Sequence, residues 1–494
     1  MSRYIFQHRW LITTLFVLIG TFLLESCATN PVTGRKEFML LSKDQELAMG
    51  QQSDPSIVSE FGVYDDETLQ NFINEKGQAM AAISHRPDLP YEFKILDSPV
   101  VNAFALPGGY VYFTRGILAH FNNEAQFAGV LGHEIGHVTA RHSAKQYSRT
   151  VLAQVGLIAG MVVAPELAQF GDVASQGLQL LLLKYGRDAE SQSDELGVEY
   201  STEIGYNAAE MADFFGTLDR LTGGAENRLP TFLSTHPDPV DRENRVGELA
   251  RDYQRKDNGG PYEVNRDEYL RMIDGLVYGE DPRQGYVENS TFYHPELKFQ
   301  YPVPQGWQLV NSPQQVQMAP EDGKAVILLQ LGQGNSLQAA AQATIEKYEL
   351  TPVSNQSTTV NGLPAYEMVA DLIQEGTDAQ GQQVRQVIRT HSYYIQYGEL
   401  IYHFFGLTME EDYSSYRGRF LATMTGFRTL TDPDKLNRLP ERIQIREIPR
   451  AMTLQDALRE FRMPTDRHEE LAILNGMQLS DQLRAGVLIK VIGE

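Results

Sequence analysis

The stretch Val130-Leu-Gly-His-Glu-Ile-Gly-His-Val138 decides how the rest of the chain is interpreted. Residues on both sides of it favour a helix, which we expect over residues 123–145. His133 and His137 are four residues apart, so in a helix both imidazoles lie on one face and can hold one zinc ion. Glu134 follows the first histidine in the H-E-x-x-H arrangement, where it can act as general base toward a water molecule at the metal.

A pair of acids downstream offers the third metal ligand. Glu190 and Asp194 are also four residues apart, inside a helix predicted over residues 175–200, so both carboxylates project from one helix face. Glu190 can complete a His/His/Glu zinc set, and Asp194 can accept the far N–H of a ligand histidine. A solvated acidic helix face would contain the same pair. Next to the upstream motif, we favour the ligand interpretation.

A proline-rich turn at residues 234–242 contains His236 and Arg242. A histidine before a proline is usually a simple turn residue. In a zinc site, however, a histidine and an arginine from a separate loop can stabilise the oxyanion of a tetrahedral intermediate. We therefore place His236 and Arg242 beside Glu134 as candidate catalytic residues.

An extended segment upstream of the motif is a candidate for substrate binding. Residues 102–114 predict two strands interrupted by a turn at residues 107–109, and Asn102, Ala103 and Phe104 open the first strand. A peptide substrate would bind by β-strand addition along this segment, because backbone hydrogen bonds hold a chain independently of its side chains. An ordinary edge strand has the same pattern, and the sequence alone does not separate the two.

The composition excludes several classes of protein. The 42 Lys and Arg residues against 64 Asp and Glu residues give a net charge of −22, so we expect no nucleic-acid partner, because phosphate binding needs concentrated positive charge. With 42% hydrophobic and 21% charged residues, the chain is typical of a folded protein and not of a multi-pass membrane protein. Its 494 residues are too many for one ordinary core, so several domains are expected.

The N-terminus resembles a lipoprotein signal. Basic residues and an apolar run too short to span a bilayer make residues 1–26 a predicted signal peptide. Leu24-Glu-Ser-Cys27 resembles a bacterial lipobox, which implies cleavage before Cys27 and lipidation of its thiol. A plain signal anchor with an incidental cysteine is the alternative. Ala28 resembles the residue found there in lipoproteins sorted to the outer membrane, which implies a periplasmic chain held at that membrane by its lipid anchor.

Taken together, His133-Glu134-x-x-His137, Glu190-x-x-x-Asp194 and His236-Pro237 resemble the bacterial lipoprotein and periplasmic branch of zinc metalloproteases that includes HtpX and the CAAX prenyl protease. Asn30-Pro-Val-Thr-Gly34 supports the resemblance, as does Asn102-Ala-Phe-Ala-Leu-Pro-Gly-Gly109. The resemblance implies a zincin-type fold, one zinc ion per chain and peptidase activity, with the turn histidine and its arginine stabilising the transition state. In some relatives the equivalent histidine instead caps the zinc in a closed, latent state.

We expect an α+β protein in several parts. The lipidated tether, residues 27–41, leads into a mainly helical zinc metalloprotease domain, residues 42–256, and then a linker, residues 257–283. Residues 284–430 predict an α+β domain of unknown function, in which two helices pack on one face of an antiparallel sheet. We find no catalytic constellation in it.

The last part, residues 441–494, predicts a strand-helix-helix-strand module that resembles LysM. Thr453-Leu454, Leu474-Asn475-Gly476 and Ala485-Gly486 carry the resemblance, which implies contact with peptidoglycan. A small structural cap on the preceding domains is the alternative.

Two functional hypotheses follow. The leading one is a zinc endopeptidase at the periplasmic face of the outer membrane, whose substrates are unfolded or misassembled envelope proteins. Its quality-control role rests on analogy with the family. The rival is a chaperone or a binding protein, in which the zinc is structural or latent and the C-terminal modules hold a partner or the cell wall.

Overall fold

The computed structural model describes residues 27–149, 185–222, 232, 236, 239–256, 260–377 and 383–494. It combines helices and sheets, as the α+β prediction requires. The predicted signal peptide, residues 1–26, lies outside the described residues. In the part of the chain that the structure describes, no helix has both the length and the apolar character needed to cross a membrane.

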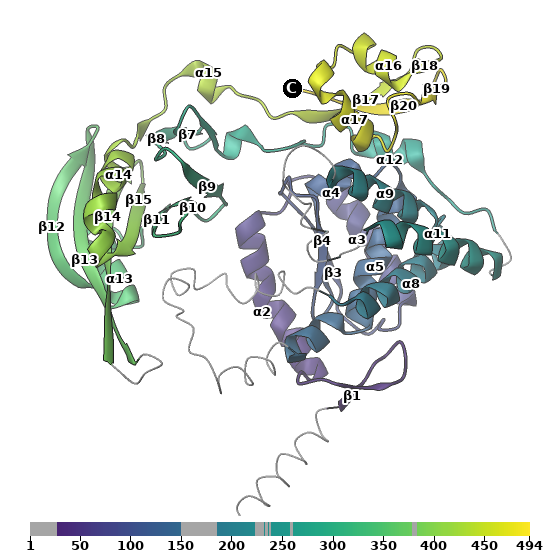
Figure 1. Ribbon diagram of the computed structural model, residues 1–494, viewed down its shortest axis with the longest axis horizontal. Coiled ribbons are helices and arrows are strands. Elements are labelled where there is room, and N and C mark those ends of the chain that lie inside the picture. The colour runs from purple at the N-terminus through teal and green to yellow at the C-terminus, as the bar shows by residue number, and fades with distance from the viewer. Residues whose placement is uncertain are drawn as a thin grey trace, which may run out of the picture.

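The first half of the chain is mostly helical and contains a small sheet (Figure 1). Its helices are α2 (Lys43–Phe61), α3 (Glu67–Ile83), α4 (Arg115–His120), α5 (Glu124–Thr139), α8 (Arg187–Glu203), α9 (Glu210–Thr222), α11 (Pro239–Lys256) and α12 (Arg266–Met272). The sheet has the order β3 (Glu92–Leu96), β5 (Tyr110–Thr114) and β4 (Ala103–Leu106), with β3 parallel and β4 antiparallel to β5. A separate ribbon pairs β1 (Cys27–Thr29) with β2 (Lys36–Phe38).

The turn between β4 and β5 is formed as predicted. Gly108 and Gly109 have φ values of +88° and +103°, in the left-handed region that glycine adopts without strain. These two residues reverse the chain, so that Ala103 pairs with Phe113. β4 is therefore an edge strand of the sheet, as one interpretation of the sequence required.

The helix that carries the histidines is shorter than predicted. It was expected over residues 123–145, but α5 ends at Thr139. Arg141 has a φ of +60°, which ends the helix because the left-handed conformation breaks the hydrogen-bonding pattern. A new helical segment begins at His142. The acidic helix also differs, since α8 begins at Arg187, and residues 175–184 of that prediction lie outside the described residues.

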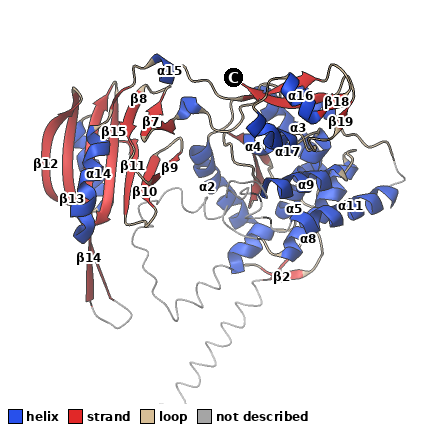
Figure 2. Cartoon of the chain, turned by 45° about the horizontal axis from the view of Figure 1, so that its top comes forward, coloured by secondary structure: helices blue, strands red, loops and turns tan. Residues whose placement is uncertain are grey.

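The middle of the chain forms two antiparallel sheets (Figure 2). The larger sheet has the order β12 (Thr351–Val360), β13 (Leu363–Thr377), β14 (Gln383–Tyr397), β15 (Leu400–Met409), β11 (Ala325–Leu331), β10 (Val316–Pro320) and β9 (Trp307–Asn311). The smaller sheet has the order β16 (Arg428–Thr429), β8 (Phe299–Pro302), β7 (Thr291–His294) and β6 (Tyr286–Glu288).

The prediction that both middle helices pack on one face of the sheet is wrong. α13 (Leu337–Tyr348) packs with the apolar cluster that includes Phe405, whereas α14 (Tyr413–Thr425) packs with the cluster that includes Phe404. Neighbouring residues of a strand point to opposite faces, so the two helices cover opposite faces. The apolar run along β15 is buried on both sides for this reason.

The C-terminal module has the predicted strand-helix-helix-strand order. Its elements are β17 (Arg442–Glu447), α16 (Leu454–Glu460), α17 (His468–Leu474) and β20 (Leu488–Gly493), with β17 antiparallel to β20. A second small pair joins β18 (Met452–Thr453) to β19 (Gln482–Leu483). The resemblance to LysM stays a prediction.

This module packs onto the helical half of the chain. Ile443, Leu471 and Ile489 belong to the same apolar cluster as Phe121 and the helix α5. The side chain of Lys490 is fully buried, and its Nζ donates to the backbone oxygens of Ala119, at 2.8 Å, and Phe121, at 2.9 Å. The module is thus continuous with the core around α5 and is not a freely tethered unit.

The middle sheets are an insertion into this common core. Val277 forms a β-bridge with Arg442, and the Tyr278 amide donates to the Glu441 oxygen at 2.8 Å. The chain therefore leaves the core and returns to it at adjacent points. The predicted linker also contributes to the core, because Tyr269 of α12 is buried in it.

Replacing Lys490 with alanine should lower the free energy of unfolding by about 2–4 kcal/mol, because it opens a cavity and leaves two buried carbonyls without donors. Chemical denaturation followed by circular dichroism measures the change. Lys43, exposed in the first turn of α2, is the matched control, and its alanine variant should unfold like the wild-type protein. Equal stability of the two variants would contradict the docking role of Lys490.

Candidate metal centre and active site

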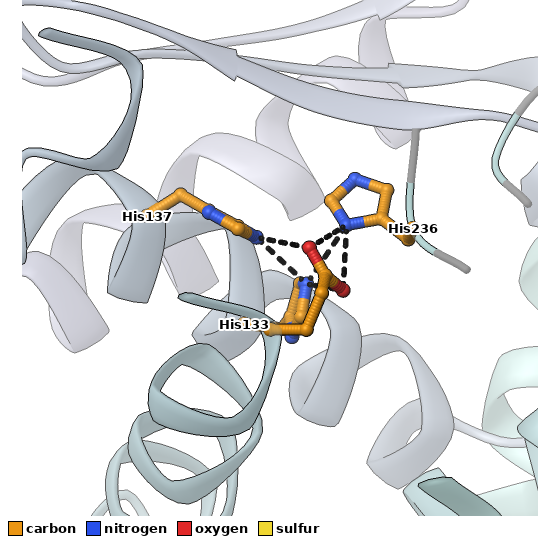
Figure 3. Close-up of side chains that lie close together, drawn as sticks. His133, His137 and His236 are labelled. Carbon is orange, nitrogen blue, oxygen red and sulfur yellow. Dashed lines mark hydrogen bonds and ion pairs between the residues drawn. The ribbon is translucent and has the colours of Figure 1, made fainter. Parts of the chain in front are cut away.

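Two helices and one loop bring four buried side chains together (Figure 3). α5 supplies His133 and His137, α8 supplies Glu190, and the segment before α11 supplies His236. Their ligand atoms all lie within 4.8 Å of one another. None of the four side chains is exposed to solvent, so the set is enclosed within the protein.

The donor atoms fit a zinc ion. His133 Nδ1 lies 3.0 Å from the Asp194 carboxylate, which can only accept, so the ring carries its proton there and presents a bare Nε2 to the centre. This Nε2 lies 3.0 Å from His137 Nε2 and 3.2 Å from His236 Nδ1. Zinc–nitrogen bonds of about 2.0–2.1 Å place tetrahedral ligands about 3.3 Å apart, close to these spacings. One cation satisfies all the contacts at once.

Glycines let α5 and α8 approach closely enough to share a metal ion. A Cβ on Gly197 of α8 would lie 3.0 Å from the Gly129 oxygen and 3.2 Å from the His133 amide. A Cβ on Gly132 of α5 would lie 3.0 Å from the Gly197 Cα. All three distances are shorter than ordinary van der Waals contacts of a carbon atom. A side chain at either glycine would therefore force the helices apart. The H-E-x-x-H motif and the acidic helix therefore meet backbone to backbone.

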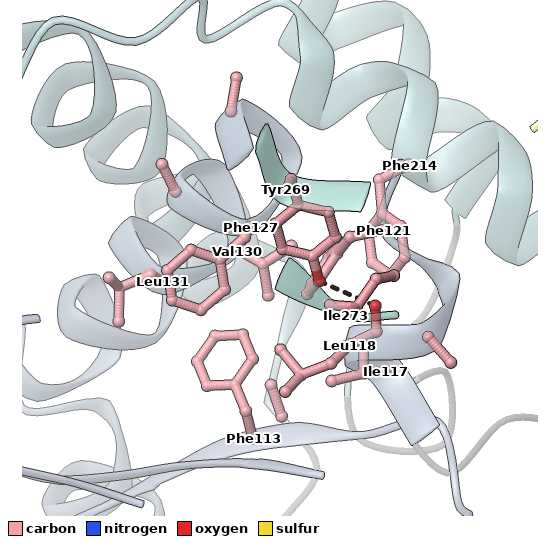
Figure 4. Close-up of a cluster of buried hydrophobic side chains, with 14 of the residues drawn as sticks. Phe113, Ile117, Leu118, Phe121, Phe127, Val130, Leu131, Phe214, Tyr269 and Ile273 are labelled. Atoms are coloured by element: carbon pink, nitrogen blue, oxygen red, sulfur yellow. Dashed lines mark hydrogen bonds between the residues drawn. The ribbon is translucent and has the colours of Figure 1, made fainter. Parts of the chain in front are cut away.

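The rest of α5 is held by the apolar core (Figure 4). Phe127, Val130 and Leu131 are fully buried in the cluster that also contains Phe113 and Phe121. Asn123 caps the helix, because its side chain accepts from the Gln126 amide at 2.8 Å. The histidines thus project from a helix whose position is fixed along its whole length.

Asp194 lies beside His133, where the predicted orienting role requires it, and the role itself stays a prediction. Besides contacting His133, its carboxylate accepts from Arg242 Nη2 at 2.6 Å and Arg242 Nε at 3.1 Å. Arg245 adds another contact to the same carboxylate. Burial alone raises the pKa of Asp194, but the guanidinium of Arg242 and the His133 ring outweigh it and hold the pKa well below its usual value.

Arg242 contacts the acids of the site. In addition to Asp194, its Nη1 lies 3.1 Å from Glu190 Oε2, and its guanidinium stacks over the Phe215 ring at 4.2 Å. Burial raises the pKa of Glu190, whereas the charges of His236 and Arg242 lower it below its usual value. The geometry makes Arg242 a positioning residue for the carboxylates, and its predicted role at the oxyanion stays a prediction.

Glu134 is the one acid of the site without a hydrogen-bonding partner. Neither of its carboxylate oxygens has such a partner among the described residues, although the side chain is fully buried. His236 Nε2 is nearby, 3.7 Å from Glu134 Oε1. Burial raises the pKa of Glu134 above its usual value, which brings it closer to the range of a general base.

His236 closes the fourth side of the centre. Its Nδ1 lies 3.0 Å and 3.1 Å from the two Glu190 oxygens, as close as a ligand of the same ion would be. The ring stacks on Phe232 with centroids 4.5 Å apart, and the His236 amide donates to the Phe232 oxygen at 2.8 Å. With His236 in this position, the described residues offer four protein ligand atoms for one ion.

Two residues next to His137 were not identified from the sequence. Tyr185 stacks on the His137 ring with centroids 4.0 Å apart. His142 Nδ1 lies 3.0 Å from His137 Nδ1. The five-residue spacing from His137 to His142 gave no signal, because a continuous helix would have placed His142 on a different face.

The predicted substrate-binding residues and the predicted lipidation site are not part of the four-residue metal centre. Asn102 lies just before β4, Ala103 and Phe104 lie in it, and all three are buried in this edge strand, which packs beside α5. The Asn102 Oδ1 has no hydrogen-bonding partner among the described residues. Cys27 opens β1 at the start of the described chain.

A His-Glu-x-x-His helix joined to a glutamate ligand on a second helix, with a buried general base beside them, defines a zinc metallopeptidase site. Residues 67–250 match peptidase family M48. This segment of the chain contains every residue of the metal centre. The finer assignment to the branch of HtpX and the CAAX prenyl protease stays a prediction.

Several known proteins are similar to part of the chain. The Arabidopsis thaliana mitochondrial metalloendopeptidase OMA1 is 32% identical over 199 residues, which cover 40% of this chain and 39% of the relative. The β-barrel assembly-enhancing protease of Escherichia coli K12 is 28% identical over 239 residues, which cover 46% of this chain and 48% of the relative. The chain thus spans less than half the length of these two relatives. OMA1 of Schizosaccharomyces pombe is 28% identical and is covered over 74% of its length.

Solved structures add little. The Saccharomyces cerevisiae Ran-binding protein Mog1p covers 30% of the chain with 11% sequence identity and a TM-score of 0.23, too low to indicate function.

Replacing Gly197 with alanine should destabilise the protein by about 1–3 kcal/mol and weaken zinc binding, because the added Cβ pushes α8 away from α5. Gly418 lies in α14, where a Cβ would meet no neighbour within 4 Å among the described residues. Its alanine variant is therefore the matched control and should be neutral or slightly stabilising. Chemical denaturation and competition with a chromophoric chelator measure the two effects. Zinc binding that is unchanged in the Gly197 variant would contradict the account of the helix contact.

Proposed function

We propose that this chain is a zinc-dependent endopeptidase of the bacterial periplasm, which cleaves misfolded or misassembled envelope proteins. The observation that carries the proposal is the unpartnered, buried carboxylate of Glu134 beside a complete set of zinc donors. The relatives named as a metalloendopeptidase and as a β-barrel assembly-enhancing protease support the activity and the substrate class. A lipid anchor on Cys27 at the outer membrane is part of the same proposal.

Glu134 performs the proton transfers of peptide hydrolysis in this proposal. When bound, zinc supplies a Lewis acid that polarises the scissile carbonyl and makes water a better nucleophile. The Glu134 carboxylate takes a proton from the attacking water and later delivers it to the leaving amine. No described residue holds its two oxygens in a hydrogen bond, so they are available for both transfers.

The substrate would bind along β4. Among the described strands only β5 pairs with β4, which packs beside α5, the helix of the metal centre. An extended peptide that added to the edge would place its backbone next to Glu134 without selecting a side-chain sequence. Such binding suits unfolded substrates. Asn102, Ala103 and Phe104 are the residues proposed to contact the peptide.

His236 acts as a latch. Its Nδ1 occupies the position that water and substrate need, and its Nε2 faces Glu134. A peptide therefore reaches the centre only after the ring moves away. This closed arrangement would limit cleavage of folded envelope proteins.

The closed centre also favours a second candidate function. Four protein ligands around one zinc ion are typical of structural sites, whereas catalytic sites keep a position open. In this alternative the chain is a latent or structural zinc protein, which acts as a chaperone or binds a partner or peptidoglycan through the middle sheets and the C-terminal module. Contact with peptidoglycan rests only on the LysM resemblance.

The variant Glu134→Gln should retain zinc and lose cleavage of casein, with kcat/KM lower by about 10²–10⁴-fold, because the amide cannot accept the proton. Metal analysis and a fluorescent casein assay measure the two properties. Glu75, exposed on α3, provides the control variant Glu75→Gln, which should cleave like the wild-type protein. Cleavage by the Glu134 variant at the wild-type rate would refute the mechanism, and absence of cleavage by any form would favour the second function.

The variant His236→Ala should cleave casein several-fold faster than the wild-type protein, because removal of the ring opens the fourth position while the other three ligands keep the metal. Zinc content measured by atomic emission checks that the site stays loaded. A loss of activity with zinc retained would instead assign His236 to transition-state stabilisation and would exclude the latch.

A further inference from the structure

The two histidine ligands from α5 differ in the partner of Nδ1, the ring nitrogen that points away from the metal centre. His133 Nδ1 faces the Asp194 carboxylate at 3.0 Å. Among the described residues, His137 Nδ1 faces no carboxylate, and its partner is the ring nitrogen Nδ1 of His142, also at 3.0 Å. The side chain of His142 is buried, and its ring is nearly perpendicular to that of His137, with an interplanar angle of 72°. A second histidine thus lies directly behind a metal ligand.

Hydrogen-bond chemistry fixes the proton on each of these rings. His137 must keep a lone pair on Nε2 to bind a metal, so its proton is on Nδ1 and donates to His142. His142 must then present a bare Nδ1 and carry its own proton on Nε2. That nitrogen lies 3.0 Å from the amide oxygen of Gln192, which accepts it. The chain of donors runs from His137 through His142 to Gln192.

A serine lies beside the same nitrogen. Ser193 Oγ is 3.2 Å from His142 Nδ1, and its hydroxyl, which can donate or accept, is compatible with this proton arrangement. The opposite arrangement, with a proton on His142 Nδ1, would make His137 Nδ1 an acceptor and place a proton on His137 Nε2. That proton would block metal binding, so only one arrangement is compatible with the zinc site.

The position of His142 depends on the left-handed residue that ends α5. Arg141 adopts a φ of +60°, an unfavourable conformation for a residue with a side chain, and this turns the chain back toward His137. Its guanidinium Nε donates to Glu46 Oε2 at 2.8 Å, and Arg86 Nη1 donates to Glu46 Oε1 at 3.0 Å. All three side chains are buried. This ion cluster compensates the strain and keeps His142 behind the ligand.

We propose that His142 is the positioning residue for the zinc ligand His137, and that Gln192 sets the tautomer of His142 through its amide oxygen. This inference rests on the zinc site of the proposed function. His142, Gln192 and Tyr185 also line a cavity of about 580 Å³. Gln192 therefore lies at the edge of a cavity and is only half-buried.

Zinc affinity of the full-length protein, measured by competition with a chromophoric chelator, tests the inference without any protease assay. The variant His142→Leu loses the acceptor, and we expect a zinc Kd about 10–100-fold higher than that of the wild-type protein. The variant His142→Asn is the matched rescue, because its amide oxygen can take the place of the imidazole nitrogen. Its Kd should lie within about 3-fold of the wild-type value.

A second pair of variants, at Gln192, tests the inference even if substitution of His142 impairs folding. Gln192→Met has a similar length but no acceptor, so His142 can change tautomer and the zinc Kd should rise. Gln192→Glu keeps an acceptor and should bind zinc like the wild-type protein. Equal zinc affinity in the members of both pairs would overturn the inference while leaving the protease proposal intact. A wild-type protein that binds no zinc would overturn both.

Discussion

The close contact between α5 and α8 is the constraint on which the rest of the site depends. Zinc demands ligands within about 2 Å of one point, so the two helices that share the ion must lie side by side. Gly132 and Gly197 permit this approach, because any Cβ on either would meet the backbone of the other helix. The ligands on the two helices then need no adjustment of their own to converge. The apolar core around Phe127 fixes α5, and α8 is held against it by the same contact.

Burial of so many polar groups is tolerated because nearly all of them are paired. Asp194 is compensated by two arginines, and the pair Arg242–Glu190 ties the ligand on α8 to the helix α11. A buried acid without a hydrogen-bonding partner lowers the stability of the fold. Such an acid marks a position where a requirement other than stability, such as catalysis, decides the residue. Among the described residues of this centre, that acid is Glu134. The polar network therefore separates residues that hold the site from the residue that is left available for proton transfer.

The sequence predicted the parts of the site that depend on local periodicity. The spacing of His133 and His137, and that of Glu190 and Asp194, places each pair on one face of its helix, and the structure brings the two faces together. The end of α5 was missed, because Arg141 leaves the helix only through a left-handed conformation that the distant Glu46 stabilises. No local pattern contains such an ion cluster. The two-sided packing of the middle sheet was missed for a related reason, since an apolar run in a strand does not specify which helix covers which face.

The C-terminal module packs into the core around the metal centre, whereas the middle sheets do not. The order of the chain explains this difference. The middle sheets have apolar clusters of their own, and the chain enters and leaves them at adjacent points beside Val277 and Arg442. An insertion with neighbouring ends can change without altering the core that surrounds it. The module that follows lies inside that core, and Lys490 donates to two carbonyls at the C-terminal end of α4, those of Ala119 and Phe121. The last strand of the chain therefore stabilises the end of α4, which directly precedes the helix that carries the zinc ligands, whereas the middle sheets pack in apolar clusters of their own.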